Sequence, residues 1–264
     1  MPRLSDSKYL SEQYKTSGNL DARRNLHARF STETYGWLPW VFDHIEAPAN
    51  AKILEVGCGT GALWSENAHR VPPRWQITLS DFSPGRLEDT RANLDGLSQQ
   101  FVYKNFDIQD IPEPDDTFDA VIANHMLYHV PERARAISEL HRVLKPGALL
   151  LTATNGENHM IELARLVQKF VPDYMKVRGA ESFGLENGAE QLSECFNNVE
   201  LLPFASSLRV TEAEPLVAYV LSSELPNLKN EKLDAFIREV EQTIEAGPFH
   251  VTKNPGLFRA RKSA

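Results

Sequence analysis

The sequence predicts an α/β protein with a doubly wound, mostly parallel, seven-stranded sheet and a helical cap. Short apolar runs alternate with helical patterns between residues 50 and 155, which is typical of βα units on a parallel sheet. A glycine-rich turn follows the first run, and an acidic residue follows the second and the third. Open α/β sheets bind ligands beyond the carboxyl ends of their strands, so these residues indicate a ligand site there.

The apolar runs have the length and composition of buried strands. We expect a sixth strand near Val199–Val210 and a last strand over Phe249–Arg261. The first five strands are expected at Lys52–Val56, Gln76–Ser80, Phe101–Phe106, Asp119–Asn124 and Ala148–Thr152.

Three helices are expected to connect these strands. The first begins near Ala62, and the second covers Pro84–Leu94. Pro131 marks the start of the third, because the missing N–H of proline would be unpaired in a first turn anyway. The third helix stops at Lys145-Pro146-Gly147, and its apolar face is expected to consist of Ala134, Ile137, Leu140 and Leu144.

Two parts of the chain are expected. Residues 1–48 form an N-terminal helical cap, and residues 49–264 form the main domain, with helical inserts at 158–180 and 212–246. We expect the leader and the inserts to form one mobile cap over the ligand site; a dimer interface is the alternative. The leader aromatics either pack a cap helix or, in the case of Tyr14 and a neighbour, close over the ligand; they include Tyr9, Tyr14, Trp37 and Trp40.

Composition narrows the class of protein. The chain has 264 residues, of which 42% are hydrophobic and 24% charged, which excludes disorder. A net charge of −8 argues against a nucleic-acid partner. No secretory signal or membrane-spanning run is recognisable. Cys58 lies inside the glycine-rich turn, where a disulfide would obstruct the backbone, so a cytoplasmic protein is expected. Cys58 and Cys195 are far apart in the sequence and no CxxC spacing occurs, so no metal site is expected.

The glycine-rich turn carries the clearest chemical signal. Glycine allows positive φ and close approach of a ligand to the backbone, and the following helix directs its free N–H groups at that ligand. The spacing is GxGxG, at Gly57, Gly59 and Gly61, whereas a dinucleotide site requires GxGxxG. Glu55 precedes the turn, and its negative charge suits a cationic sulfonium better than a pyrophosphate.

The segment ILEVGCGTG resembles motif I of the class I S-adenosylmethionine-dependent methyltransferases, and the resemblance extends over Lys52–Thr154. It implies a Rossmann-like fold and S-adenosylmethionine as cofactor. It also implies that Asp81 holds the ribose hydroxyls, with Phe82 and Ser83 beside it. It implies that Asp107 and Ile108 contact the adenine and that Asn124 faces the methionyl part. The other cofactor-binding positions implied belong to motif I and are Glu55, Gly57, Cys58, Gly59 and Gly61.

The candidate catalytic residues follow the fourth strand. His125 and His129 are able to remove a proton near neutral pH, and Tyr128 is able to orient an acceptor or shield the sulfonium. Each histidine has a purely structural role as its alternative.

The sequence therefore predicts methyl transfer from S-adenosylmethionine to a small molecule, at an O, N or C atom that it does not identify. One alternative is a methyltransferase-like module that binds the cofactor without catalysis. The other, less favoured, is an NAD(P)-dependent oxidoreductase. The expected partner is the small-molecule acceptor, with neither nucleic acid nor membrane; a homodimer is the alternative use of the helical inserts.

Overall fold

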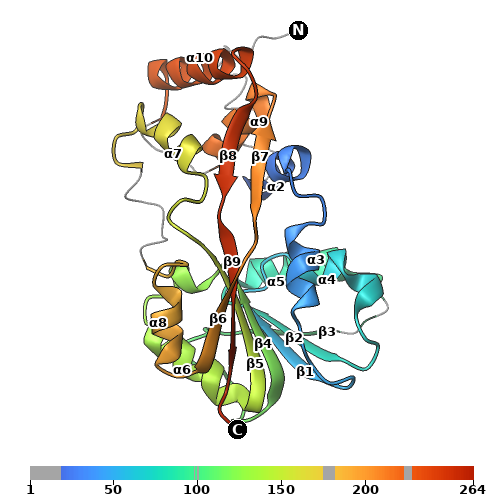
Figure 1. The fold of residues 1–264 in the computed structure, drawn as a ribbon. Helices are drawn as coiled ribbons and strands as arrows, with labels where there is room; N and C mark the ends of the chain where they lie inside the picture. Colours follow the sequence, from blue (N-terminus) through green and yellow to red (C-terminus); the bar gives the residue numbers. More distant parts are fainter. Residues whose placement is uncertain (1–18, 98, 100, 175–181, 223–227) are drawn as a thin grey trace. The chain divides into compact units, whose positions relative to one another are not determined.

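The structure is a computed structural model, and it describes residues 19–97, 99, 101–174, 182–222 and 228–264 (Figure 1). Tyr9 and Tyr14 lie outside the described residues. The chain divides into two compact units. Unit 1 takes its residues from Met1–Thr34, Asn158–Arg178 and Ala205–Asn254, and unit 2 takes its residues from Tyr35–Glu157, Gly179–Phe204 and Pro255–Ala264.

A seven-stranded sheet is the centre of unit 2. Its strand order is β3-β2-β1-β4-β5-β9-β6, and β9 is antiparallel to both neighbours while β1 to β5 pair in parallel. This confirms the predicted mostly parallel sheet of seven strands. The strands are β1 (Lys52–Val56), β2 (Gln76–Asp81), β3 (Phe101–Asn105), β4 (Phe118–Asn124), β5 (Leu144–Asn155), β6 (Asn197–Pro203) and β9 (Pro255–Arg261).

Helices cover both faces of this sheet because alternate strand residues are apolar on each side. Leu54 of β1 packs in one buried cluster with residues of α6 and α8, whereas Ile53 packs in a second with residues of α3, α4 and α5. Figure 1 shows α6 and α8 on the opposite side of the sheet from α3 and α4. The helices of unit 2 are α3 (Trp37–Asp43), α4 (Ala62–Glu66), η1 (Ala68–Arg70), α5 (Pro84–Leu94), η2 (Leu127–His129), α6 (Arg133–Val143) and α8 (Gly188–Ser193).

Unit 1 has its own core around a two-stranded antiparallel sheet of β7 and β8. Its buried side chains include Phe30, Leu163, Leu216 and Phe236, one from each of the four helices formed by the described residues of this unit. No helix among the described residues is long and apolar enough to cross a membrane. The elements of unit 1 are α2 (Asn19–Phe30), α7 (Ile161–Gln168), β7 (Ser206–Val210), α9 (Ala213–Leu221), α10 (Glu231–Glu245) and β8 (Phe249–Lys253).

The two late strands were predicted wrongly as continuous. The run near Val199–Val210 is β6 followed by β7, and Phe249–Arg261 is β8 followed by β9, with the two halves of each run in different sheets. Pro203 ends β6 and Pro255 begins β9, and proline has no N–H to continue a ladder. The Phe204 N–H donates to the Pro255 carbonyl at 3.1 Å, which holds the two interruptions together.

The helix expected from Pro131 begins two residues later. The α6 helix spans Arg133–Val143, and Leu144, expected on its apolar face, is the first residue of β5. Pro146 restricts the residue before it to extended conformations, which explains why the helix ends early. Leu144 is nevertheless fully buried, as an apolar residue at that position should be.

Candidate functional site

The three glycines of the turn between β1 and α4 all have positive φ: 64° at Gly57, 60° at Gly59 and 70° at Gly61. A Cβ atom at Gly57 would lie 2.9 Å from Met126 Cβ, and one at Gly61 would lie 2.9 Å from Thr90 Cγ2. A Cβ atom at Gly59 would meet no heavy atom of the described residues within 4 Å. Packing therefore requires Gly57 and Gly61, whereas Gly59 borders open space that a ligand can enter.

Hydrogen bonds from β2 and α5 hold this turn in shape. The Cys58 N–H donates to the Ser80 carbonyl at 2.9 Å, and the Thr90 hydroxyl lies 2.7 Å from the Gly59 carbonyl oxygen. Asn93 Nδ2 donates to the Thr60 carbonyl at 3.1 Å. Burial raises the pKa of the Cys58 thiol to about 12, so this side chain is a neutral packing group. Cys58 therefore contributes its backbone, and not thiolate chemistry, to the turn.

Asp81, the last residue of β2, lies directly against the turn. Its Oδ2 accepts from the Gly59 N–H at 3.1 Å, and its Oδ1 accepts from the Ser83 N–H at 2.9 Å. Each carboxylate oxygen has a second lone pair, so Asp81 is able to accept from two ligand hydroxyls as well. Ser83 caps α5, and Phe82 is 75% exposed. The exposed Phe82 ring is free to pack on a planar ligand.

The residues expected at the adenine lie on the loop after β3. Asp107 accepts from the Gln109 backbone N–H at 2.9 Å and from Gln109 Nε2 at 2.8 Å. The side chain of Ile108 is buried in the cluster under α6 and cannot meet a ring at the surface. Any contact of Ile108 with a ligand must therefore come from its backbone.

Glu55 of β1 is buried beneath the turn. Trp64 Nε1 donates to its Oε2 at 2.6 Å. Burial raises the pKa of Glu55 to about 7, against the lowering effects of Trp64 and of the Asn124 amide. The Asn124 amide is close enough to lower the pKa of Glu55, but neither its Nδ2 nor its Oδ1 meets the distance and angle of a normal hydrogen bond with any described residue, although both atoms are buried. An unpaired buried amide costs about 1–3 kcal/mol, so Asn124 fits a polar ligand group that both donates and accepts.

His125 follows β4 with a left-handed backbone, at φ 50°. His125 is half-buried, and this burial lowers the pKa of its imidazole to about 4, so the ring is neutral and weakly basic near neutral pH. Tyr128 and His129 belong to η2, where their rings lie 4.5 Å apart and His129 is exposed. No three histidine, cysteine or acidic side chains of the described residues meet as metal ligands.

An aromatic cluster beside His125 was not predicted as part of the site. The Trp37 ring lies 5.3 Å from the rings of Trp40 and His125, and 5.4 Å from Phe204. Trp37 Nε1 is buried and has no hydrogen-bond partner among the described residues. The sequence shows an aromatic leader, but it contains no signal that brings Trp37 to Phe204, which lies far along the chain.

The structure thus brings most of the expected cofactor residues into one contiguous group at the carboxyl ends of β1, β2 and β4. The Gly59 and Ser83 N–H groups donate to Asp81, and both Asp81 and Asn124 influence the pKa of Glu55. Asp107 and Ile108 stand apart, on the loop after the neighbouring strand β3, and contact their own loop and α6. A doubly wound sheet with this glycine turn and these acids defines a domain for a nucleoside-containing cofactor.

Comparison with known proteins shows which family the middle of the chain is similar to. A model described as a methyltransferase domain matches residues 54–152. The ubiquinone/menaquinone biosynthesis C-methyltransferase of Saccharophagus degradans is 32% identical over 132 residues, covering 48% of this chain and 53% of that protein. Human methyltransferase-like protein 27 is 41% identical over 113 residues, covering 42% of this chain and 44% of that protein.

Solved structures share the fold. A methyltransferase of unassigned activity from Bacillus halodurans superposes with a TM-score of 0.59 at 20% identity, covering 86% of this chain and 99% of that chain. Residues 54–152 are thus similar to a methyltransferase domain, and the fold is the one that solved methyltransferase structures share. The chain spans about half the length of the curated relatives that it matches.

Proposed function

We propose that the whole protein is an enzyme that transfers the methyl group of S-adenosylmethionine to an O, N or C atom of a small molecule and releases S-adenosylhomocysteine. The observation that carries this proposal is the open space at Gly59 beside the Asp81 carboxylate. The curated relative from Saccharophagus degradans methylates carbon in quinone biosynthesis, which supports a metabolite as acceptor.

We assign the cofactor contacts to residues around that space. Asp81 accepts from the ribose hydroxyls, Asp107 from the adenine amine, and the Ile108 backbone meets the ring. Asn124 faces the methionyl group, because its side-chain amide offers both a donor and an acceptor, which match a carboxylate and an ammonium. The turn backbone of Gly57, Cys58, Gly59 and Gly61 lies along the ligand, with Glu55 beneath it as the nearby negative charge and Phe82 and Ser83 beside the ribose.

Methyl transfer needs positioning and, for some acceptors, a base. His129 is the better base of the two histidines, since it is exposed, whereas the pKa of His125 is lowered to about 4 by burial. His125 then positions the aromatic cluster around Trp37, and Tyr128 orients the acceptor or shields the sulfonium. The free thiols of Cys58 and Cys195 support the cytoplasm as location, and the net charge of −8 supports the absence of a nucleic-acid partner.

Calorimetric titration of S-adenosylhomocysteine tests the cofactor site. Asp81→Ala should weaken binding by about 1.5–3 kcal/mol, because the ribose hydroxyls lose a charged acceptor. Asp95→Ala, which removes an exposed aspartate at the end of α5, serves as the matched control and should bind as the wild type does. Heat from NADH but none from S-adenosylhomocysteine would favour the oxidoreductase. Binding without methyl transfer to any quinol, amine or phenol offered would favour the non-catalytic module.

A further inference from the structure

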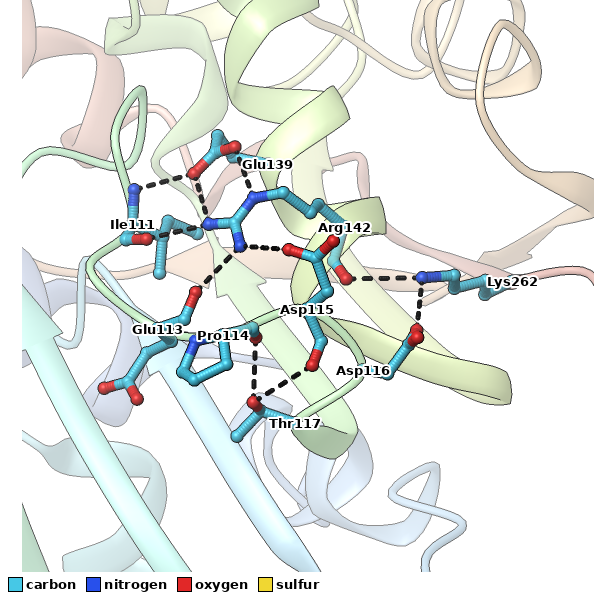
Figure 2. A network of polar contacts seen from close by, with 9 residues as sticks. All are labelled: Ile111, Glu113, Pro114, Asp115, Asp116, Thr117, Glu139, Arg142 and Lys262. Atoms are coloured by element: carbon cyan, nitrogen blue, oxygen red, sulfur yellow. Dashed lines mark hydrogen bonds and ion pairs between the residues drawn. The ribbon is translucent and has the colours of Figure 1, made fainter.

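The loop between β3 and β4, residues 106–117, carries Asp107 and Ile108 but has no regular helix or strand of its own. A loop of this length that reads a ligand must be held by contacts with other elements. Figure 2 shows that many of these contacts come from the end of α6.

Arg142 is the centre of this network (Figure 2). Its Nη1 donates to the Glu113 carbonyl at 2.8 Å and to Asp115 Oδ1 at 2.7 Å. Its Nη2 donates to the Ile111 carbonyl and to Glu139 Oε2, both at 2.8 Å, and its Nε donates to Glu139 Oε1 at 2.7 Å. A guanidinium has five N–H donors, so the whole donor capacity of Arg142 is spent on the loop and on Glu139.

Glu139 completes the clamp. Its Oε2 accepts from the Ile111 N–H at 2.9 Å, so both backbone polar groups of Ile111 are fixed. The hydrogen bond from Arg142 holds the pKa of Glu139 below its usual range. The pair therefore stays ionised and bonded near neutral pH.

The start of α6 holds the other end of the same loop. Gln109 Oε1 accepts from the Glu132 N–H at 2.9 Å, while the amide nitrogen of Gln109 donates to Asp107 at 2.8 Å. One helix thus fixes the loop at Gln109, next to the proposed adenine contact, and again at Ile111, Glu113 and Asp115.

The solvent exposure of the Arg142–Asp115 ion pair indicates that it positions the loop rather than stabilises the fold. The side chains of Arg142 and Asp115 are 30% and 70% exposed. Partly exposed ion pairs contribute only about 0–1 kcal/mol to folding. The network therefore adds little to stability, but its bidentate geometry defines the path of the loop backbone.

We propose that Arg142 is the positioning residue for adenine recognition: through Glu139 and the carbonyls of Ile111 and Glu113, it sets the position from which Asp107 and the Ile108 backbone read the base. This inference rests on the proposed function, since it needs the cofactor at that loop. Arg142 itself touches no ligand.

The test compares two ligands that differ only on the edge of the base formed by N1 and the group at C6. S-adenosylhomocysteine carries an amine donor at C6 and an acceptor at N1, whereas S-inosylhomocysteine carries a carbonyl acceptor at C6 and an N–H at N1, so the donor and acceptor positions read by Asp107 and the Ile108 backbone are exchanged. The dissociation constants of both are measured by calorimetry on the wild type, Arg142→Lys and Arg142→Met. Arg135→Met removes an exposed charge from the same helix and is the matched control, because Arg135 acts on Glu139 only through its charge, as the smallest of the effects that lower the pKa of Glu139, and does not bond to the loop in the described structure.

We expect the wild type and Arg135→Met to prefer the adenine ligand. Arg142→Met should bind S-adenosylhomocysteine at least about tenfold more weakly, because displacement of a recognition group by about 1 Å costs that much or more. Its affinity for S-inosylhomocysteine should change less, so that the preference falls. Arg142→Lys keeps the charge but not the five donors and should fall between the two.

A folded Arg142→Met with unchanged preference would overturn the inference, and if that variant does not fold, the same result for Arg142→Lys would overturn it. A wild type that binds both ligands equally would also overturn it while leaving the proposed function intact. A wild type that binds neither ligand would instead refute the proposed function.

Discussion

Replacing Gly59 by alanine, the smallest possible change, tests whether the glycine-rich turn between β1 and α4 contacts the cofactor. Gly59 has a φ of 60°, a region that costs an L-residue about 1–2 kcal/mol. The new Cβ meets no described atom within 4 Å, so no packing penalty adds to that strain. The free energy of unfolding should therefore fall by about 1–2 kcal/mol and no more.

The effect on binding should be larger than this strain suggests. If the cofactor lies against Gly59, the added methyl group occupies its space, and we expect S-adenosylhomocysteine affinity to fall at least about tenfold, or about 1.4 kcal/mol. Gly147 is a matched control, because its φ of 75° and the open space around it are similar, while it precedes the core of β5 and is far in sequence from the turn.

Chemical denaturation and calorimetry on the same preparations decide the outcome. Gly59→Ala and Gly147→Ala should lose similar stability, and only Gly59→Ala should lose affinity. Unchanged affinity in Gly59→Ala would mean that the turn does not approach the ligand, and the reasoning from the open space would be wrong.

Two further predictions concern pH. The pKa of Glu55 is raised from 4.5 to about 7 in the folded protein, so the unfolded state loses this proton first. The free energy of unfolding should therefore fall as pH rises between these values, by on the order of 3 kcal/mol. Denaturant titrations should show that Glu55→Gln removes this pH dependence, and an unaltered pH profile would contradict the prediction. The pKa of His125 is lowered from 6.5 to about 4, so the unfolded state binds the proton first and stability falls as pH drops through that range. His125→Asn, which tolerates the left-handed backbone, should be less sensitive to acid than the wild type, and equal sensitivity in acid titrations followed by circular dichroism would count against a half-buried neutral imidazole.

Local patterns were sufficient for the parallel half of the sheet and for the cofactor turn. β1 is buried at every position after Lys52 because both faces are covered, and the GxGxG spacing follows it directly. The late strands were harder, because their division into β6 with β7 and β8 with β9 depends on which distant strand each half pairs with. Pro203 and Pro255 mark where each run is interrupted, but no local signal indicates which strand each half pairs with.

The supports of the site were harder still to predict. Asp81 is recognisable from its place at the end of a strand. The Trp64 bond to Glu55 and the Arg142 bonds to the loop of residues 106–117 connect groups that only tertiary packing brings together. The sequence presents Trp64 as one apolar residue on a short helix and Arg142 as one charge on a helix face. Their functions depend on which groups they reach: the Glu55 carboxylate for Trp64, and loop carbonyls and carboxylates for Arg142.

The position of β9 has a consequence for how the protein is made. β6 pairs with no strand of its sheet except β9, and β9 follows every other strand in the sequence. On the ribosome, β5 is synthesised more than a hundred residues before β9, the strand that lies beside it, so its outer edge stays unpaired during most of elongation. The nascent chain exposes two strand edges until Pro255–Arg261 emerges, and chaperone binding during translation would protect those edges from pairing with other chains.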